Sequence, residues 1–292
     1  MDYAIQTPWS DPGVHAGLFD ALPDDIPGIA AVTRDLVIHY RGGGIEFTGE
    51  RLAEIDSRWV SAILATDNKR NGTRLAAPRE PADRVVGCCR DHTLLFVSAL
   101  RHKGIPARSR VGFAEYFAEG FNHDHVVAEY WNGDRWVMID TELDQAGYPF
   151  DVQDMPVGPF RSAAEVWLGY RSGELDGDKY GADPNPDTPL KLHGGWFIRN
   201  YVHYQLAHLN GDELLLWDNW GTMSDRLDGA DVELTDRIAQ LMVASDNGDE
   251  AATKEVDDLY RTDPDLTFTG RSFVTSPAMK PPFEWVDLSA GR

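Results

Sequence analysis

The sequence has only two cysteines among its 292 residues, and they are adjacent, at positions 88 and 89. Two neighbouring cysteines cannot build a disulfide framework, because a bridge between them would be strained. The sequence therefore predicts free thiols in a reducing compartment. What remains open is whether either thiol is a nucleophile, a metal ligand or buried packing.

Basic residues are also scarce. The chain has 27 Lys and Arg against 48 Asp and Glu, which gives a formal net charge of -21. Such acidity disfavours nucleic acid and anionic membrane surfaces as partners, since both are polyanions. No apolar run approaches the roughly 20 residues that span a bilayer, and the first residues lack the basic and apolar regions of a secretory signal. We therefore expect a cytoplasmic protein with neither kind of partner.

The first half of the chain predicts helices followed by an antiparallel sheet. Amphipathic helices are expected over residues 27–41 and 49–67, and a helix over 89–103 should end at Gly104. Strands are expected over residues 107–117, 125–131 and 135–143. The last two are separated by the hairpin signal Asn132-Gly133. This order predicts an α+β fold with an antiparallel sheet.

The second half predicts mainly helices. The helix candidates cover residues 159–175, 195–210 and 231–247, separated by loops rich in Gly, Pro and Asp. The Trp-rich segment 214–221 is expected to pack in the core. We predict two parts, residues 1–150 as a core and residues 151–292 as a helical extension packed on it. The second part could equally be a small separate domain.

Cys89 lies where a nucleophilic cysteine would be placed. It begins the helix 89–103, and Gly87 just before it can adopt the special backbone angles of a tight turn. A helix start and a neighbouring imidazole both lower the pKa of a thiol, and the thiolate is the reactive form. The free N–H groups of the first turn could also stabilise an oxyanion. We therefore expect a thiol of lowered pKa at Cys89.

A base and a carboxylate follow on the predicted strands. His125 begins one strand and Asp140 ends the next, and the two lie almost symmetrically about Gly133. In a hairpin they would be cross-strand neighbours, so that the carboxylate holds one imidazole tautomer. A Cys–His–Asp set of this kind performs acyl transfer through a thioester.

Four ordered motifs resemble the transglutaminase-like superfamily. They are Gly87-x-Cys89, Arg101 with Gly-Ile-Pro-Ala-Arg at 104–108, His125-x-x-x-Glu129 and Trp136-x-x-x-Asp140. The resemblance covers residues 84–145. It implies a papain-like core whose nucleophile-bearing helix packs on an antiparallel sheet, with Cys89 as nucleophile, His125 as base and acid, and Asp140 as orienting carboxylate. We expect no cofactor and no metal.

Cys88 is the alternative to Cys89. The register of the resemblance favours Cys89, and the neighbouring position points about 100° away on a helix. Cys88 is then expected to be a small buried apolar residue.

A metal site is a second alternative. His123, His125 and Glu129 have the spacing of a cupin-like site and fall on one face of a strand. However, no second histidine motif of that kind follows, and a helix at Cys89 does not belong in a jelly roll. In the acyl-transfer interpretation His123 lies at the cleft rim, and Glu129 is a structural partner of Arg108 or Arg110.

The expected substrate is an amide or ester in a small molecule, peptide or protein. Hydrolysis and transfer to an amine differ only in which acceptor reaches the thioester. The absence of a signal sequence, a calcium loop and an accessory β-domain favours a hydrolase or small-molecule acyltransferase over protein cross-linking. The residues that surround the catalytic cysteine of arylamine acetyltransferases are missing here, which disfavours acetyl-CoA as the acyl donor. A non-catalytic binding or scaffold protein of the same fold is the alternative from another class.

Overall fold

A computed structural model of the chain describes residues 1–185, 191–227 and 230–289. Its helices are α1 Ile26–Leu36, α2 Gly49–Leu52, α3 Val60–Asn71, α4 Cys89–His102, α5 Ala163–Ser172, α6 Gly195–Leu209, α7 Ala230–Asp246 and α8 Glu250–Thr262. Its strands are β1 Val37–His39, β2 Val85–Gly87, β3 Ala107–Ala118, β4 Phe121–Trp131, β5 Trp136–Ile139, β6 Phe160–Ser162, β7 Tyr180–Gly181, β8 Asp218–Asn219, β9 Arg271–Val274 and β10 Glu284–Asp287. The fold is α+β, as predicted from the sequence.

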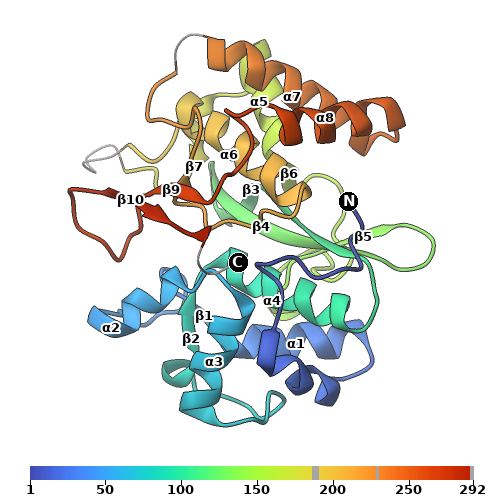
Figure 1. Cartoon of the computed structure of the whole chain (residues 1–292), viewed down its shortest axis with the longest axis vertical. Coiled ribbons are helices and arrows are strands. Elements are labelled where there is room, and N and C mark those ends of the chain that lie inside the picture. The colour runs from blue at the N-terminus through green and yellow to red at the C-terminus, as the bar shows by residue number, and fades with distance from the viewer. Residues whose placement is uncertain (186–190, 228–229, 290–292) are drawn as a thin grey trace.

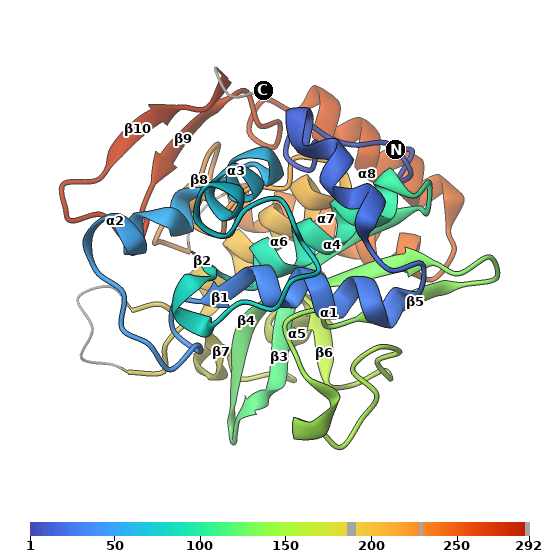
Figure 2. The same cartoon turned by 90° about the horizontal axis from the view of Figure 1, so that it is seen from below.

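The central sheet is antiparallel with the order β5-β4-β3-β6, and the short β7 pairs with β4 in parallel. Helix α4 packs on β4 from one side, and α6 packs on β3 from the other. Figure 1 shows the N-terminal helices on the α4 side and α5 to α8 on the α6 side. The view from below in Figure 2 shows the same layers, with α4 in front of α6. Both faces of the sheet are therefore covered.

Helix α4 confirms the predicted nucleophile helix. It ends at His102, with Lys103 as C-cap, and Gly104 has a φ of 74°. This left-handed conformation is one that glycine adopts without a steric cost, so the glycine stop expected from the sequence is present. The hairpin turn also forms, because the Asn132 side chain accepts hydrogen bonds from the backbone N–H groups of Asp134 and Arg135.

The two N-terminal helix predictions are partly wrong. The helix predicted over 27–41 ends at Leu36, because Val37 and Ile38 pair in parallel with Val85 and Val86. β-branched residues suit such a buried strand pair. The helix predicted over 49–67 is interrupted near Arg58, whose carbonyl accepts a hydrogen bond from the buried Arg90 guanidinium. Tertiary contacts therefore override the local helical pattern.

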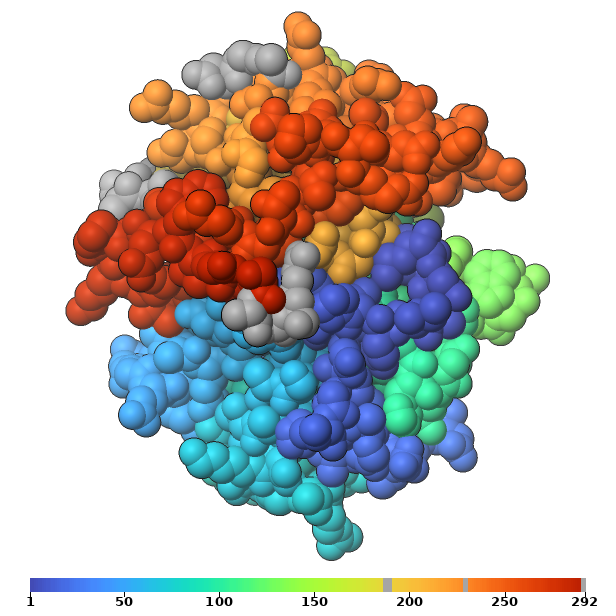
Figure 3. All heavy atoms as spheres, viewed as in Figure 1, coloured from blue at the N-terminus to red at the C-terminus, as the bar shows by residue number. Residues whose placement is uncertain are grey.

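The two predicted parts of the chain share apolar packing. The largest cluster of buried apolar side chains contains residues of α1, α3 and α4 together with residues of α5, α6 and α7. In Figure 3 the C-terminal segment lies directly against the N-terminal half on the face shown. The boundary at residue 150 stays a prediction.

Buried ion pairs also join the N-terminal and C-terminal halves. Arg58 holds the Asp218 carboxylate at 2.7 and 2.9 Å, and Arg101 holds Glu213 at 2.9 Å. The C-terminal half also contains the small sheet β10-β9-β8, which the sequence analysis did not predict. In the part of the chain that is described, no helix is long and apolar enough to cross a membrane.

Candidate active site

Cys89 is the first residue of α4, and only Cys88 separates it from β2 of the parallel strand pair β1–β2. Cys88 is the N-cap residue, and its backbone N–H donates to Asp91 Oδ2 at 2.9 Å. Gly87 is required for space, because a Cβ there would lie 2.7 Å from Asp91 Oδ2 and 2.9 Å from Val37 Cγ1. Its φ is not positive, so the prediction that Gly87 supplies special backbone angles is wrong.

His125 and Asp140 are in direct contact. His125 Nε2 lies 2.7 Å from Asp140 Oδ2, and each residue is only 2% exposed. The contact is diagonal across the sheet: the register that pairs Ala128 with Ile139 would place Val127 opposite Asp140. Asp140 itself lies just beyond the end of β5, and its backbone N–H bonds to Val152 instead. The predicted proximity across the hairpin is therefore correct, and the two residues are diagonal neighbours, not directly opposite ones.

Two further groups hold the Asp140 carboxylate. The Tyr116 hydroxyl donates to Asp140 Oδ2 at 2.6 Å, and the Glu142 backbone N–H donates to Asp140 Oδ1 at 3.0 Å. The rings of Tyr116 and Phe117 also flank His125, with centroid distances of 6.1 and 4.9 Å. The sequence analysis missed Tyr116, although its place near the end of a strand beside His125 could have indicated it.

The charges within this group reinforce one another. Burial by itself raises the pKa of Asp140, but His125, Tyr116 and the Glu142 amide outweigh it, and the pKa of Asp140 is lowered. Burial lowers the pKa of His125, but the Asp140 carboxylate outweighs it, and the pKa of His125 is raised. A carboxylate only accepts hydrogen bonds, so Nε2 of His125 carries the proton toward Asp140. In the neutral ring, Nδ1 is then the nitrogen able to accept a proton.

The thiol differs from the expectation. Its hydrogen bond with Cys88, followed by burial, raises the pKa of Cys89 well above its ordinary value, and the negative charges of Glu142 and Asp124 act in the same direction. Cys89 is 4% exposed. The predicted lowered pKa of Cys89 is therefore wrong for the free protein, because the hydrogen bond with Cys88, burial and the neighbouring acids outweigh the helix start. Cys89 is a neutral thiol at rest.

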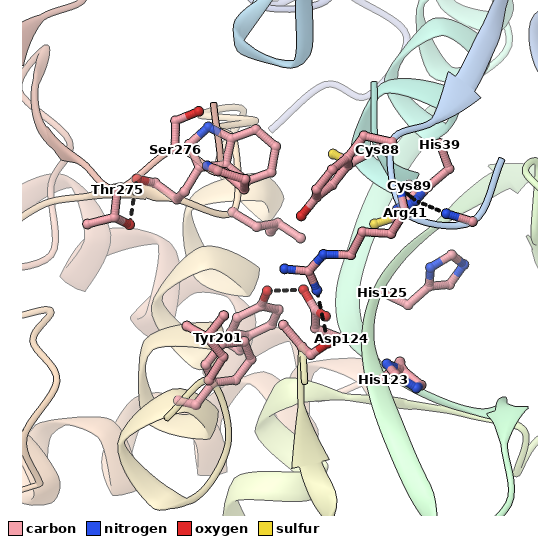
Figure 4. Close-up of a pocket in the computed structure, with 18 of the residues that line it drawn as sticks. His39, Arg41, Cys88, Cys89, His123, Asp124, His125, Tyr201, Thr275 and Ser276 are labelled. Carbon is pink, nitrogen blue, oxygen red and sulfur yellow. Dashed lines mark hydrogen bonds between the residues drawn. The ribbon is translucent and has the colours of Figure 1, made fainter. Parts of the chain in front are cut away.

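Cys89 and His125 line one cavity of about 470 Å³, which Cys88 also lines. Figure 4 shows this cavity with both thiols, His125 and the polar residues around them. The polar lining includes His39, Arg41, His123, Asp124 and Glu142. Asp140 lies behind His125 and is not part of the lining. The structure thus joins His125 to Asp140 by a hydrogen bond, and it brings Cys89 to the same cavity.

The C-terminal half of the chain supplies much of the cavity wall. The apolar lining includes Tyr40, Phe117, Phe197, Tyr201, Leu216, Trp217, Met279 and Phe283. One carboxylate fixes part of this wall, because Asp56 accepts hydrogen bonds from Trp217 Nε1 and from Ser276 Oγ, both at 2.8 Å. In the Trp-rich segment, Trp220 is buried in the core as predicted, whereas Trp217 lines the cavity.

Two of the three residues of the alternative metal site have other partners, since His125 contacts Asp140 and Glu129 contacts two arginines. Glu129 accepts a hydrogen bond from Arg108 at 2.7 Å and lies 3.7 Å from Arg110, as expected for a structural residue. Across the described ranges, no three His, Cys, Asp or Glu side chains are grouped to hold a metal. His123 lines the cavity and is half-buried.

Comparisons with known proteins add a family assignment for part of the chain. Residues 57–141 match the family model of the transglutaminase-like superfamily. No curated protein matches the chain. One solved structure that aligns with the chain is a candidate cysteine protease from Cytophaga hutchinsonii. The sequence identity is 14% and the TM-score is 0.34. The alignment covers 55% of this chain and 44% of that one, and so extends over less than half of that protein.

Proposed function

Residues 57–141 form a core of the transglutaminase-like superfamily, and from this premise we propose that the protein is an enzyme that forms a thioester at Cys89. The substrate is an amide or an ester. The observation that carries the proposal is the buried His125–Asp140 hydrogen bond of 2.7 Å beside a cavity that Cys89 also lines. The motif order Cys, His, Asp in the sequence supports it independently.

Each group has one role in this reaction. Nδ1 of His125 takes the proton from the neutral Cys89 thiol while the sulfur attacks the carbonyl carbon of the substrate. The carbon–nitrogen or carbon–oxygen bond then breaks, and the leaving group takes the proton back from Nδ1. Water or an amine, deprotonated by the same nitrogen, attacks the thioester and releases the thiol. Asp140 stabilises the imidazolium that forms in both steps.

The cavity favours a bulky apolar acyl group. Its apolar lining is largely aromatic, and residues such as Phe197, Tyr201 and Trp217 come from outside the matched family core. A cavity of about 470 Å³ has room for an acyl chain or an aromatic acyl group. In this proposal the C-terminal half selects the acyl group, and the family core supplies the chemistry. Hydrolysis is the default outcome, since water needs no binding groove of its own.

A series of p-nitrophenyl esters from acetate to hexanoate tests the proposal. If each added methylene is buried against the apolar lining, kcat/KM should rise by about fourfold per methylene, from roughly 0.8 kcal/mol of transfer energy. After subtraction of the uncatalysed aminolysis measured without protein, adding a primary amine should increase p-nitrophenolate release only if the thioester can be transferred. The product, free acid or amide, then distinguishes a hydrolase from an acyltransferase.

The two cysteines offer a matched control. Both Cys89→Ala and Cys88→Ala remove one buried thiol from the same cavity. Cys89→Ala should abolish turnover of the esters, whereas Cys88→Ala should retain it. Equal activity of Cys89→Ala and the wild type would overturn the proposal. Wild-type protein that turns over no ester but binds the corresponding acid in the cavity would identify the chain as a binding protein instead.

A further inference from the structure

His39 lies beside the start of the nucleophile helix. It ends strand β1, and the parallel pairing with β2 places it next to Gly87, two residues before Cys89. His39 and Cys89 both line the cavity, and both are labelled in Figure 4. The sequence analysis did not select His39, because the parallel pairing of two short strands far apart in the sequence creates this position.

Backbone hydrogen bonds fix the tautomer of His39. Its Nδ1 accepts from the backbone N–H groups of Arg41 and Gly42, each at 3.1 Å. A nitrogen that accepts two N–H groups carries no proton, so the proton of the neutral ring is on Nε2. The ring is neutral, since burial and then the charges of His125 and Arg41 lower the pKa of His39 to about 3. His39 therefore has one N–H available as a donor.

His39 and His125 thus have opposite hydrogen-bonding roles. His125 donates through Nε2 to Asp140, which leaves Nδ1 as a proton acceptor. His39 accepts through Nδ1, which leaves Nε2–H as a donor that has no hydrogen-bond partner among the described residues. A second histidine of this tautomer cannot act as the base. It can donate a hydrogen bond to an oxygen that becomes negative during the reaction.

We infer that Nε2–H of His39 and the backbone N–H of Cys89 form the oxyanion hole of the proposed thioester chemistry. Because Cys89 is the first residue of α4, its N–H has no partner within the helix. As the sulfur adds to the carbonyl carbon, the carbonyl π electrons move to oxygen, and the two N–H donors stabilise that charge. The inference rests on the proposed function, since it assigns a donor to the same reaction.

Two amide substitutions separate this role from a purely structural one. His39→Asn places a side-chain oxygen near the position of Nδ1, where it can still accept from Arg41 and Gly42, but it lacks the Nε2–H donor. His39→Gln reaches the position of Nε2 with an amide N–H. Loss of one oxyanion donor costs roughly 10²- to 10³-fold in rate. We therefore expect His39→Asn to lose that factor and His39→Gln to recover part of it.

The assay is single-turnover acylation of Cys89 by p-nitrophenyl butyrate, with alkylation by iodoacetamide as the reference reaction. Alkylation at the methylene carbon develops no charge on the carbonyl oxygen, so it should be unchanged in His39→Asn. If His39→Asn is acylated at the wild-type rate, or if acylation and alkylation are slowed equally, the inference is overturned. Wild-type protein that is not acylated at Cys89 would overturn the proposed function as well, which distinguishes the two failures.

A second measurement needs no substitution. When butanal adds to the thiol it forms a tetrahedral adduct whose oxygen occupies the position of the oxyanion. The ¹H–¹⁵N signal of the His39 Nε2–H in the wild-type protein should then move downfield. An adduct that forms on Cys89 and leaves this signal in place would contradict the inference.

Discussion

Replacing Asp140 by Asn tests the proposed role of the His125–Asp140 pair. The Asp140 carboxylate accepts from His125 and Tyr116 on Oδ2 and from the Glu142 N–H on Oδ1, so all its partners are donors. An asparagine side chain has one acceptor oxygen and one donor NH₂ group. Whichever way it is oriented, the NH₂ group faces an N–H or O–H that previously donated to Asp140.

The two orientations have different consequences. If NH₂ faces His125, the ring must accept through Nε2, so its proton moves to Nδ1, and Nδ1 can no longer take the thiol proton. If NH₂ faces the Glu142 amide, two donors meet in a buried place, which costs about 1–3 kcal/mol. The first orientation is therefore expected. The wrong tautomer costs roughly 10⁴-fold in kcat in a triad of this kind, or about 5.5 kcal/mol of transition-state stabilisation.

The assay is the pH dependence of single-turnover acylation by p-nitrophenyl butyrate. In the wild type the pKa of His125 is raised by Asp140, so acylation should increase with pH through a value above 6.5. Asp140→Asn removes the negative charge that favours the imidazolium, so the remaining activity should increase through a lower pH. Tyr116→Phe is the control, since it removes one donor to Asp140 but leaves the His125 tautomer, and should cost about tenfold. A rate for Asp140→Asn equal to that of Tyr116→Phe would refute the reasoning.

Three other predictions follow from the structure. Because the hydrogen bond with Cys88 raises the pKa of Cys89, Cys88→Ala should shift alkylation of Cys89 by iodoacetamide to lower pH; an unchanged profile contradicts this. Burial raises the pKa of Glu142 to about 7. An unfolded glutamate ionises near pH 4.5. The contribution of Glu142 to the free energy of unfolding should therefore decrease as the pH rises from 4.5 to 7, by up to about 3 kcal/mol. In urea titrations, Glu142→Gln should lose less stability than the wild type as the pH rises over this range. Equal losses would refute the raised pKa of Glu142. Glu213→Gln leaves the buried Arg101 guanidinium without its ion-pair partner and should lower the free energy of unfolding by about 3–5 kcal/mol; an unchanged urea midpoint would contradict this.

The sequence predicted the parts of the candidate site that lie in local motifs. Cys89 at a helix start, and His125 and Asp140 on the two strands of one hairpin, have short-range signals that spacing alone reveals. The α+β class followed from the same pattern of one helix and successive strands. These signals do not depend on how distant segments pack.

The rest of the site depends on long-range packing. His39 reaches the cavity only because β1 pairs with β2, and the segment was predicted as helix because its apolar residues also fit a helical period. Trp217 and Phe197 line the cavity because the C-terminal half packs on the core. The raised pKa of Cys89 likewise depends on its hydrogen bond with Cys88 and on burial, which follow from the packed structure and not from the helix start that the sequence reveals.

The central claim is that Cys89 receives an acyl group with His125 as the base. The most direct test is to mix the protein with p-nitrophenyl butyrate, quench it in acid and locate the butyryl group by mass spectrometry. Trypsin should release residues 85–90, which contain both cysteines, so fragmentation of this peptide tells which sulfur is acylated. We predict a butyryl thioester on Cys89 that is lost in His125→Ala. A butyryl group on Cys88, or acylation of Cys89 that is unaffected in His125→Ala, would contradict the account.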